Sequence, residues 1–164
     1  MKRGEFMEPW GLAAGPDNTI FVADRDNNRI QRLDIDGKVL SSFGKFGAAS
    51  GHLAFPMYAA AGKNGKLYVL DATGRVQRFT PGGVYECEVL PWGVRGNMRA
   101  ADGRLYFLED YNRAVRCVVE DGEVQWFCRF SDESPAKSVA WGGIAVYDGY
   151  LYSGRRRLRL PADK

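Results

Sequence analysis

Polar residues whose types could do chemistry recur at similar spacing along the chain. The first group is complete, with Asp24, Asn27 and Arg29. The second keeps Asp71 and Arg75, and the third has Glu109 in place of the aspartate and keeps Asn112. Such groups could bind a polar ligand. They could also form a charge-assisted pair across a hairpin whose turn places an asparagine in the left-handed conformation. Because the set recurs, we interpret these residues as specifying the structure of each repeat.

Sulfur and imidazole groups offer no metal or nucleophile site. Cys87, Cys117 and Cys128 form no CxxC pair, and His52 is the only histidine. A zinc site needs several such ligands at short spacing. Neither a glycine-rich phosphate loop nor a GxSxG elbow is present. We therefore expect no catalytic residue, no metal and no cofactor, and we expect reduced, mostly buried thiols.

Two further groups of residues are candidates for binding a partner. Trp92 and Trp141 fall in predicted loops between repeats, and loops on one side of a repeat fold commonly contact partners. A basic run lies near the end of the sequence: Arg155, Arg156, Arg157 and Arg159. These arginines are typical of a degraded edge strand that stays solvated. The alternative is a contact for an acidic partner or RNA, which would weaken steeply with salt.

The elements that must position these residues are short strands in a repeating unit. The segment beginning TIFVADRDNNRIQRL at Thr19 is echoed from Lys66, from Arg104 and, in damaged form, from Tyr150. Aligned apolar positions are Ile20, Leu67, Leu105 and Leu151, which lie 47, 38 and 46 residues apart. This is the period of a four-stranded blade. We predict an all-β fold in a single domain, 1–164, with blades at about 9–47, 53–90, 94–130 and 138–160, the last partial.

Aromatic residues keep one position in all four units. They are Phe21, Tyr68, Tyr106 and Tyr152. Packing between neighbouring blades requires such regularity, so we expect these rings in the core.

Residues 4–47 resemble an NHL repeat. The resemblance rests on Pro9, Val22, Asp24, Asn27, Arg29, Ile30, Asp36-Gly37-Lys38 and Phe43-Gly44. The same entry recurs as GHLAFP before the second unit. The resemblance implies a β-propeller, usually of about six blades, which would need roughly 250 residues, so we expect an open or incomplete ring. Amidating lyases of similar fold hold a metal with several histidines. This sequence has a single histidine, so the resemblance implies no metal or catalytic residue here.

Overall composition fits a globular chain. Its 164 residues are 45% hydrophobic and 26% charged, with a formal net charge of +3. This net charge is too small to indicate a nucleic-acid binder. The basic character is concentrated in residues 155–164, which hold five basic residues against one acidic residue. No long apolar run or leader sequence is evident, which favours a cytoplasmic protein away from membranes.

These observations favour a non-enzymatic protein-interaction or scaffold module. An open propeller has an apolar sheet face at each end, and large apolar faces are rarely left in water. We expect self-association or a protein partner that covers those faces. The alternatives are part of a propeller enzyme, a lyase or hydrolase acting at the axial channel, an RNA-binding protein that uses the arginine cluster, or a decayed gene fragment.

Overall fold

The computed structural model describes residues 4–63, 65–94, 96–109, 114–119, 124–129, 144–147, 150–153 and 156–160. The first sheet consists of β1 (Pro9–Gly15), β2 (Thr19–Asp24), β3 (Arg29–Asp34) and β4 (Val39–Phe43). The second consists of β5 (Pro56–Ala61), β6 (Leu67–Asp71), β7 (Val76–Phe79) and β8 (Tyr85–Leu90). A short 3-10 turn, η1 (Arg25–Asn27), joins β2 to β3.

The third sheet repeats the same order, and the fourth has three described strands. The third contains β9 (Met98–Ala101), β10 (Arg104–Glu109), β11 (Ala114–Val119) and β12 (Val124–Arg129). The fourth contains β13 (Ile144–Tyr147), β14 (Tyr150–Ser153) and β15 (Arg156–Arg159). All pairings between the named strands are antiparallel, and no sheet among the described residues closes on itself. The predicted all-β fold of antiparallel blades in an open ring is confirmed.

Tight turns produce this up-and-down order. Asp17 and Asn18 have φ angles of 56° and 53°, and Asp102 and Gly103 have 52° and 73°. Such left-handed pairs match the twist of the strands that they join, and Asp, Asn and Gly tolerate them best. The sequence therefore sets hairpins between these neighbouring strands.

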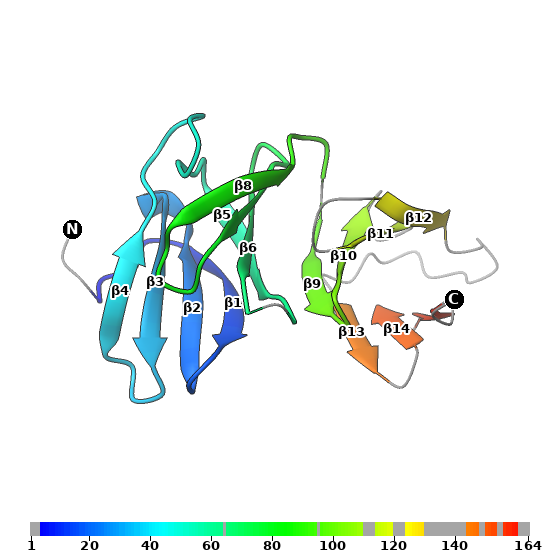
Figure 1. The fold of residues 1–164 in the computed structure, drawn as a ribbon, viewed down its shortest axis with the longest axis horizontal. Helices are drawn as coiled ribbons and strands as arrows, with labels where there is room; N and C mark the ends of the chain where they lie inside the picture. Colours follow the sequence, from blue (N-terminus) through cyan, green and yellow to red (C-terminus); the bar gives the residue numbers. More distant parts are fainter. Residues whose placement is uncertain are drawn as a thin grey trace.

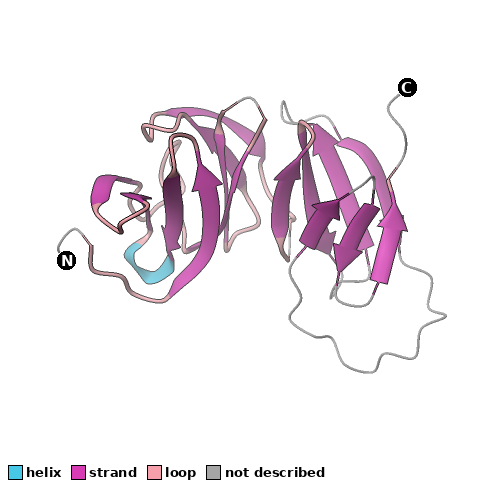
Figure 2. Ribbon diagram, turned by 90° about the horizontal axis from the view of Figure 1, so that it is seen from below, coloured by secondary structure: helices cyan, strands magenta, loops and turns pink. Residues whose placement is uncertain are grey.

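The four blades stand side by side, with the first and the fourth at opposite ends of the molecule (Figure 1), and the view from below shows the sheets built from short strands joined by loops (Figure 2). The core lies between successive blades. Phe21 and Ile30 of the first blade pack against Leu67 and Phe79 of the second. Similar clusters join the second blade to the third and the third to the fourth. Each fully buried side chain of this size stabilises the fold by about 1.5–3 kcal/mol.

Glycine allows the innermost strands to approach each other. A Cβ atom on Gly11 in β1 would lie 2.4 Å from the carbonyl oxygen of Met57 in β5. That distance is far inside van der Waals contact, so a side chain here would push the two strands apart. Gly11 therefore sets how closely β1 of the first blade approaches β5 of the second.

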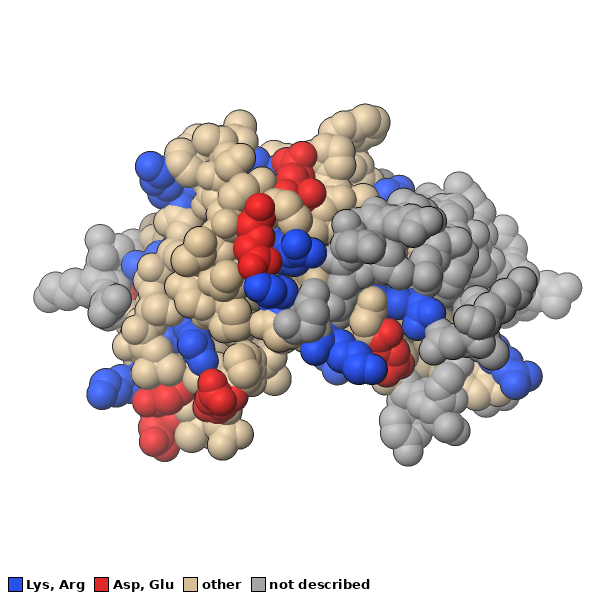
Figure 3. Space-filling view, in the orientation of Figure 1, with Lys and Arg blue, Asp and Glu red and all other residues tan. Residues whose placement is uncertain are grey.

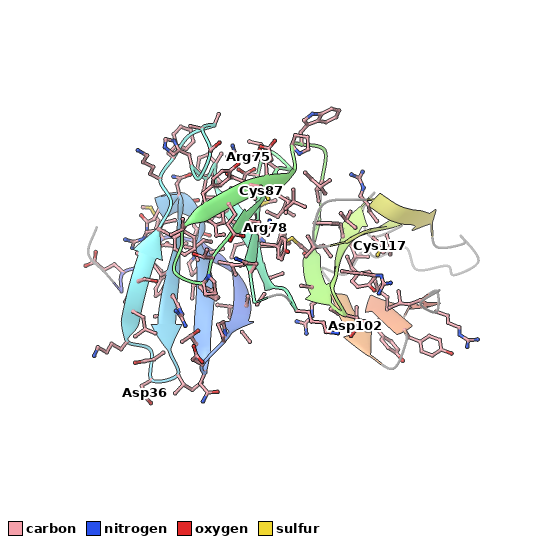
Figure 4. All side chains as sticks on the ribbon, viewed as in Figure 1. Asp36, Arg75, Arg78, Cys87, Asp102 and Cys117 are labelled. Carbon is pink, nitrogen blue, oxygen red and sulfur yellow. The ribbon has the colours of Figure 1, made fainter. Side chains whose placement is uncertain are left out.

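The strand register fixes the relative positions of Cys117 and Cys128. Cys117 lies opposite Trp126 and Cys128 lies opposite Val115, so the two cysteines are diagonal neighbours. Cys117 is buried between the third and fourth blades (Figure 4). Burial raises the pKa of its thiol from 9.0 to about 11, because the charged thiolate would lose its hydration.

We expect Cys117 to resist alkylation in the folded protein. At pH 8 the buried thiol stays protonated and inaccessible, whereas half-buried Cys87 reacts. Iodoacetamide labelling followed by peptide mass spectrometry measures both sites, with urea-unfolded protein as the control. Since folding raises the Cys117 pKa, its contribution to stability is present below pH 9.0 and is lost as the pH rises through about 11. Equal labelling of both cysteines in the folded protein would contradict this packing.

Candidate interaction surfaces

A buried carboxylate organises the first hairpin. Asp24, at the end of β2, accepts hydrogen bonds from Arg29 Nε at 2.7 Å and from Asn27 Nδ2 at 2.9 Å. It also accepts from the backbone N–H of Met7 at 2.8 Å. Asn28, not Asn27, adopts the left-handed conformation, with φ of 54°. The predicted Asp24–Arg29 pair therefore closes the hairpin and also holds the segment that enters the blade.

The second blade repeats this arrangement with Asp71 and Arg75. Asp71 Oδ2 lies 2.9 Å from Arg75 NH2, and both side chains are buried. The guanidinium also donates to the carbonyl oxygens of Ala48 at 2.7 Å and His52 at 2.8 Å. Arg75 lies near the loop end of its blade (Figure 4). The guanidinium thus joins the hairpin to the connection from the preceding blade.

The third copy is described only in part. Glu109 ends β10 and pairs through its backbone with Ala114, the first residue of β11. Asn112 lies outside the described residues. The described groups of the motif all contact their own blade or its entry.

Two buried glutamines complete the repeat and were missed by sequence reasoning. Gln31 accepts a hydrogen bond from Gly4 N at 3.1 Å and donates to the Glu5 carbonyl at 3.0 Å. Gln77 accepts from Gly51 N at 2.9 Å and donates to the His52 carbonyl at 2.7 Å. The sequence does contain a signal for them, because the runs RIQR and RVQR place a glutamine at the same position of both units. We call residues 4–9 and 51–56, which these glutamines hold, the entry segments of the first and second blades.

Each blade has two faces with different partners. We call the face that packs on the preceding blade the leading face and the opposite one the trailing face. The leading face of the second blade includes Leu53, Ala59 and Leu67, which are buried against the trailing face of the first blade. The strand registers place Leu12 and Ile20 of the first blade at the positions of Ala59 and Leu67. The matching entry segments place Phe6 at the position of Leu53.

Three apolar side chains on the leading face of the first blade are more exposed than their counterparts in the second blade. Leu12 is 71% exposed, whereas its counterpart Ala59 is 6% exposed. Phe6 is 38% exposed, whereas Leu53 is fully buried. Ile20 is half-buried, whereas Leu67 is buried. We call Phe6, Leu12 and Ile20 the open face. Apolar side chains that meet a neighbouring blade elsewhere in the molecule here meet solvent.

A second apolar surface lies on the loop side of the first two blades. The Arg25 guanidinium lies 5.5 Å from the ring centre of Trp10 and 5.4 Å from that of Phe55. Phe46 packs against Phe55 at 5.8 Å between ring centres. Trp10 donates to the Tyr58 hydroxyl at 3.3 Å. Trp and Arg are enriched among residues that dominate protein interfaces, yet the sequence offered no repeat pattern that singled out this group.

Of the residues predicted to bind a partner, those that the structure describes lie in other segments than the open face. Trp92 is 75% exposed in the connection from β8 to β9, which lies on the same upper side as the β4–β5 connection in Figure 1. Trp141 and Arg155 lie outside the described residues. Arg156 and Arg157 belong to β15, and Arg159 at its end is exposed. The structure thus places the basic run on a strand of the last blade.

Charged side chains on the described surface alternate in sign. In Figure 3 the coloured acidic and basic groups are interspersed on the visible face. Glu86 pairs with Lys66 and with Arg78 Nε, the latter at 3.0 Å. Lys66, followed by Arg78, holds the pKa of the Glu86 carboxyl below its usual value. One carboxylate is thus shared between two cations. Within the described part of the chain, no three histidine, cysteine or acidic side chains gather as a metal set.

No described helix is long and apolar enough to cross a membrane.

Comparison with family models matches residues 6–33 to the NHL repeat. Over these residues the first blade resembles an NHL repeat. The match runs from Phe6 in the entry segment to Leu33 in β3 and includes the buried Asp24 carboxylate. The NHL pattern therefore covers both the polar group that holds the entry segment and all three residues of the open face.

Two curated proteins share sequence with part of this chain. Protein brain tumor from Drosophila melanogaster is 39% identical over 61 residues, which are 37% of this chain and 6% of that protein. Protein lin-41 from Caenorhabditis elegans is 45% identical over 38 residues, 23% of this chain and 3% of that protein. The chain spans a small fraction of the length of these relatives.

Solved propeller-like structures resemble the whole arrangement of blades. Virginiamycin B lyase from Staphylococcus aureus superposes with a TM-score of 0.62 and 21% identity, over 88% of this chain and 48% of the lyase chain. A streptogramin B lyase gives 0.64 and 16%, over 94% and 55%. A chain of the nidogen/laminin complex gives 0.62 and 15%, over 88% and 71%. At these identities the likeness concerns the fold.

Proposed function

We propose that this chain is a protein-interaction module built from NHL-type blades, which binds a blade-shaped protein surface across its open face. The observation that carries this proposal is that Phe6 and Leu12 are exposed and Ile20 is half-buried, although their counterparts in the second blade are buried in a blade-to-blade contact. Burial of these apolar groups would drive association through the hydrophobic effect.

The form of the partner follows from the internal contact. In the second blade the counterparts of the open face pack against Ala13, Phe21 and Ala23. A partner that fits the open face therefore presents small residues beside an aromatic ring on a sheet face. Gln31 and Asp24 already hold the entry segment in place, so Phe6 is ordered before binding. Such preorganisation lowers the entropy lost on association.

Sedimentation velocity of the purified chain tests this proposal. We expect the weight-average sedimentation coefficient to rise between about 1 and about 500 µM. Leu12→Glu places a charge in the contact and is expected to weaken association at least about tenfold. Ile35→Glu is the matched control, because Ile35 is 69% exposed in the turn after β3 and lies outside the open face.

Association that Leu12→Glu weakens and Ile35→Glu leaves unchanged supports the proposal. A chain that remains monomeric throughout the range, or two variants that behave alike, would count against it. Far-UV circular dichroism of both variants establishes that the substitutions leave the strands folded.

A further inference from the structure

We propose that the surface covering the open face is the trailing face of the last blade of a second copy, so that the chains associate head to tail. This inference rests on the proposed function and specifies its partner. A head-to-tail contact uses two different surfaces of one chain, whereas a symmetric contact uses the same surface twice. The blades of this chain already contact one another through unlike faces.

Three successive contacts follow one rule. Phe21 of the first blade, Tyr68 of the second and Tyr106 of the third are buried in clusters that join each blade to the next. In each case the aromatic ring lies on the trailing face. The leading face that receives it carries Leu67 in the second blade, Leu105 in the third and Leu151 in the fourth. The arrangement is therefore a repeated, one-directional contact.

The last blade presents the other half of this contact. Leu151 is buried against the third blade, so its neighbour Tyr152 lies on the opposite, trailing face of the same strand. Strand pairing places Tyr152 opposite Arg157, as Tyr68 lies opposite Arg78 and Phe21 opposite Arg32. Tyr152 is half-buried, whereas the three aromatic residues at its position in the earlier blades are buried.

One chain thus carries both complementary surfaces, one at each end of the row of blades (Figure 1). Phe6, Leu12 and Ile20 form the receiving surface, and Tyr152 is the aromatic residue of the inserting surface. Tyr150 stacks near Tyr152, with 6.3 Å between ring centres, and widens that apolar surface. A second copy supplies what each surface lacks. If two copies make this contact twice, they form a closed ring. If the rotation between copies does not allow closure, further copies add to form longer assemblies.

Mixing of two variants separates head-to-tail association from symmetric association. Leu12→Glu damages only the open face, and Tyr152→Glu damages only the trailing face of the last blade. We expect each variant alone to associate at least about tenfold more weakly than the unmodified chain. We expect an equimolar mixture to form heterodimers, because an intact trailing face on one variant meets an intact open face on the other.

Sedimentation velocity and native mass spectrometry with one variant isotopically labelled identify the species. Recovery of association in the mixture also establishes that both variants are folded. If Tyr152→Glu lowers the near-UV circular dichroism signal, Tyr152→Gln is used in its place. Ile35→Glu, in the turn after β3 and outside both surfaces, is again the control and is expected to associate as the unmodified chain does.

Three outcomes overturn the inference. If Tyr152→Glu associates normally while Leu12→Glu does not, open faces meet other open faces, and the proposed function stands without this partner. If both variants are monomeric and the mixture remains monomeric, the two surfaces do not meet. If the unmodified chain itself never associates, the proposed function fails as well.

Discussion

Replacing Asp71 with alanine is expected to lower the free energy of unfolding by about 3–5 kcal/mol, because it leaves a buried cation without its partner. Asp71 Oδ2 accepts from both Nε and NH2 of Arg75, at 3.2 and 2.9 Å, and Oδ1 accepts from the backbone N–H of Thr73 at 3.0 Å. The guanidinium retains only carbonyl partners after the substitution. Urea denaturation followed by tryptophan fluorescence measures the change.

Asp36→Ala is the matched control for this prediction. Asp36 is exposed in the turn between β3 and β4, at the far end of the first blade from Arg75 (Figure 4). Its replacement is expected to change the free energy of unfolding by less than about 0.5 kcal/mol. If Asp71→Ala lowers the free energy of unfolding as little as Asp36→Ala does, the repeated carboxylate does not stabilise the blade. That result would favour a ligand-binding role for the carboxylate instead.

Replacing Leu53 with alanine is expected to cost about 2–5 kcal/mol of folding free energy, whereas Phe6→Ala is expected to cost less than about 1 kcal/mol in the monomer. The two residues occupy the same position in two entry segments. Leu53 is buried between the first and second blades, and Phe6 belongs to the open face. Urea denaturation at low micromolar protein concentration compares the two variants without association.

The contrast between these two variants tests whether the first blade lacks a neighbour on its leading face. Equal losses would mean that Phe6 is as well packed as Leu53, and the open face would not exist in solution. A larger effect of Phe6→Ala at high concentration than at low concentration would agree with a contact between copies, since truncation then removes packing between chains.

The hairpins could be derived from the sequence because their determinants are local. Asp24 and Arg29 are five residues apart across one turn, so strand geometry alone brings their side chains together. Aromatic residues at the positions of Phe21 and Tyr68 could likewise be assigned to the core, because they recur with the blade period. Local spacing and repetition are visible in a single sequence.

Contacts between separate segments were less accessible. Gln31 sits in a strand where polar and apolar residues alternate, and its role appears only when residue Gly4 is seen beside it. Arg25, Trp10 and Phe55 come from η1, β1 and the β4–β5 connection, and their meeting depends on how two blades pack. Trp10 was therefore not singled out from the sequence, although its ring lies beside the Arg25 guanidinium and its indole N–H donates to the Tyr58 hydroxyl.

Exposure of an apolar residue is also a property of packing. Leu12 has the sequence surroundings of a core residue, since it lies in a strand that pairs with buried Val22. Only the strand register, which equates Leu12 with Ala59, reveals that a neighbouring blade would cover it. The sequence could predict that an open propeller has uncovered ends, and the structure names the residues.

Hydroxyl-radical footprinting at increasing protein concentration tests the central claim most directly. Leu12 and Ile35 have similar exposure, 71% and 69%, in the same blade. We predict that both side chains are oxidised at low concentration, and that Leu12 alone becomes protected as the chains associate. Oxidation of Leu12 that continues to match that of Ile35 at every concentration, while the protein is associated, would contradict the assignment of the open face as the interaction surface.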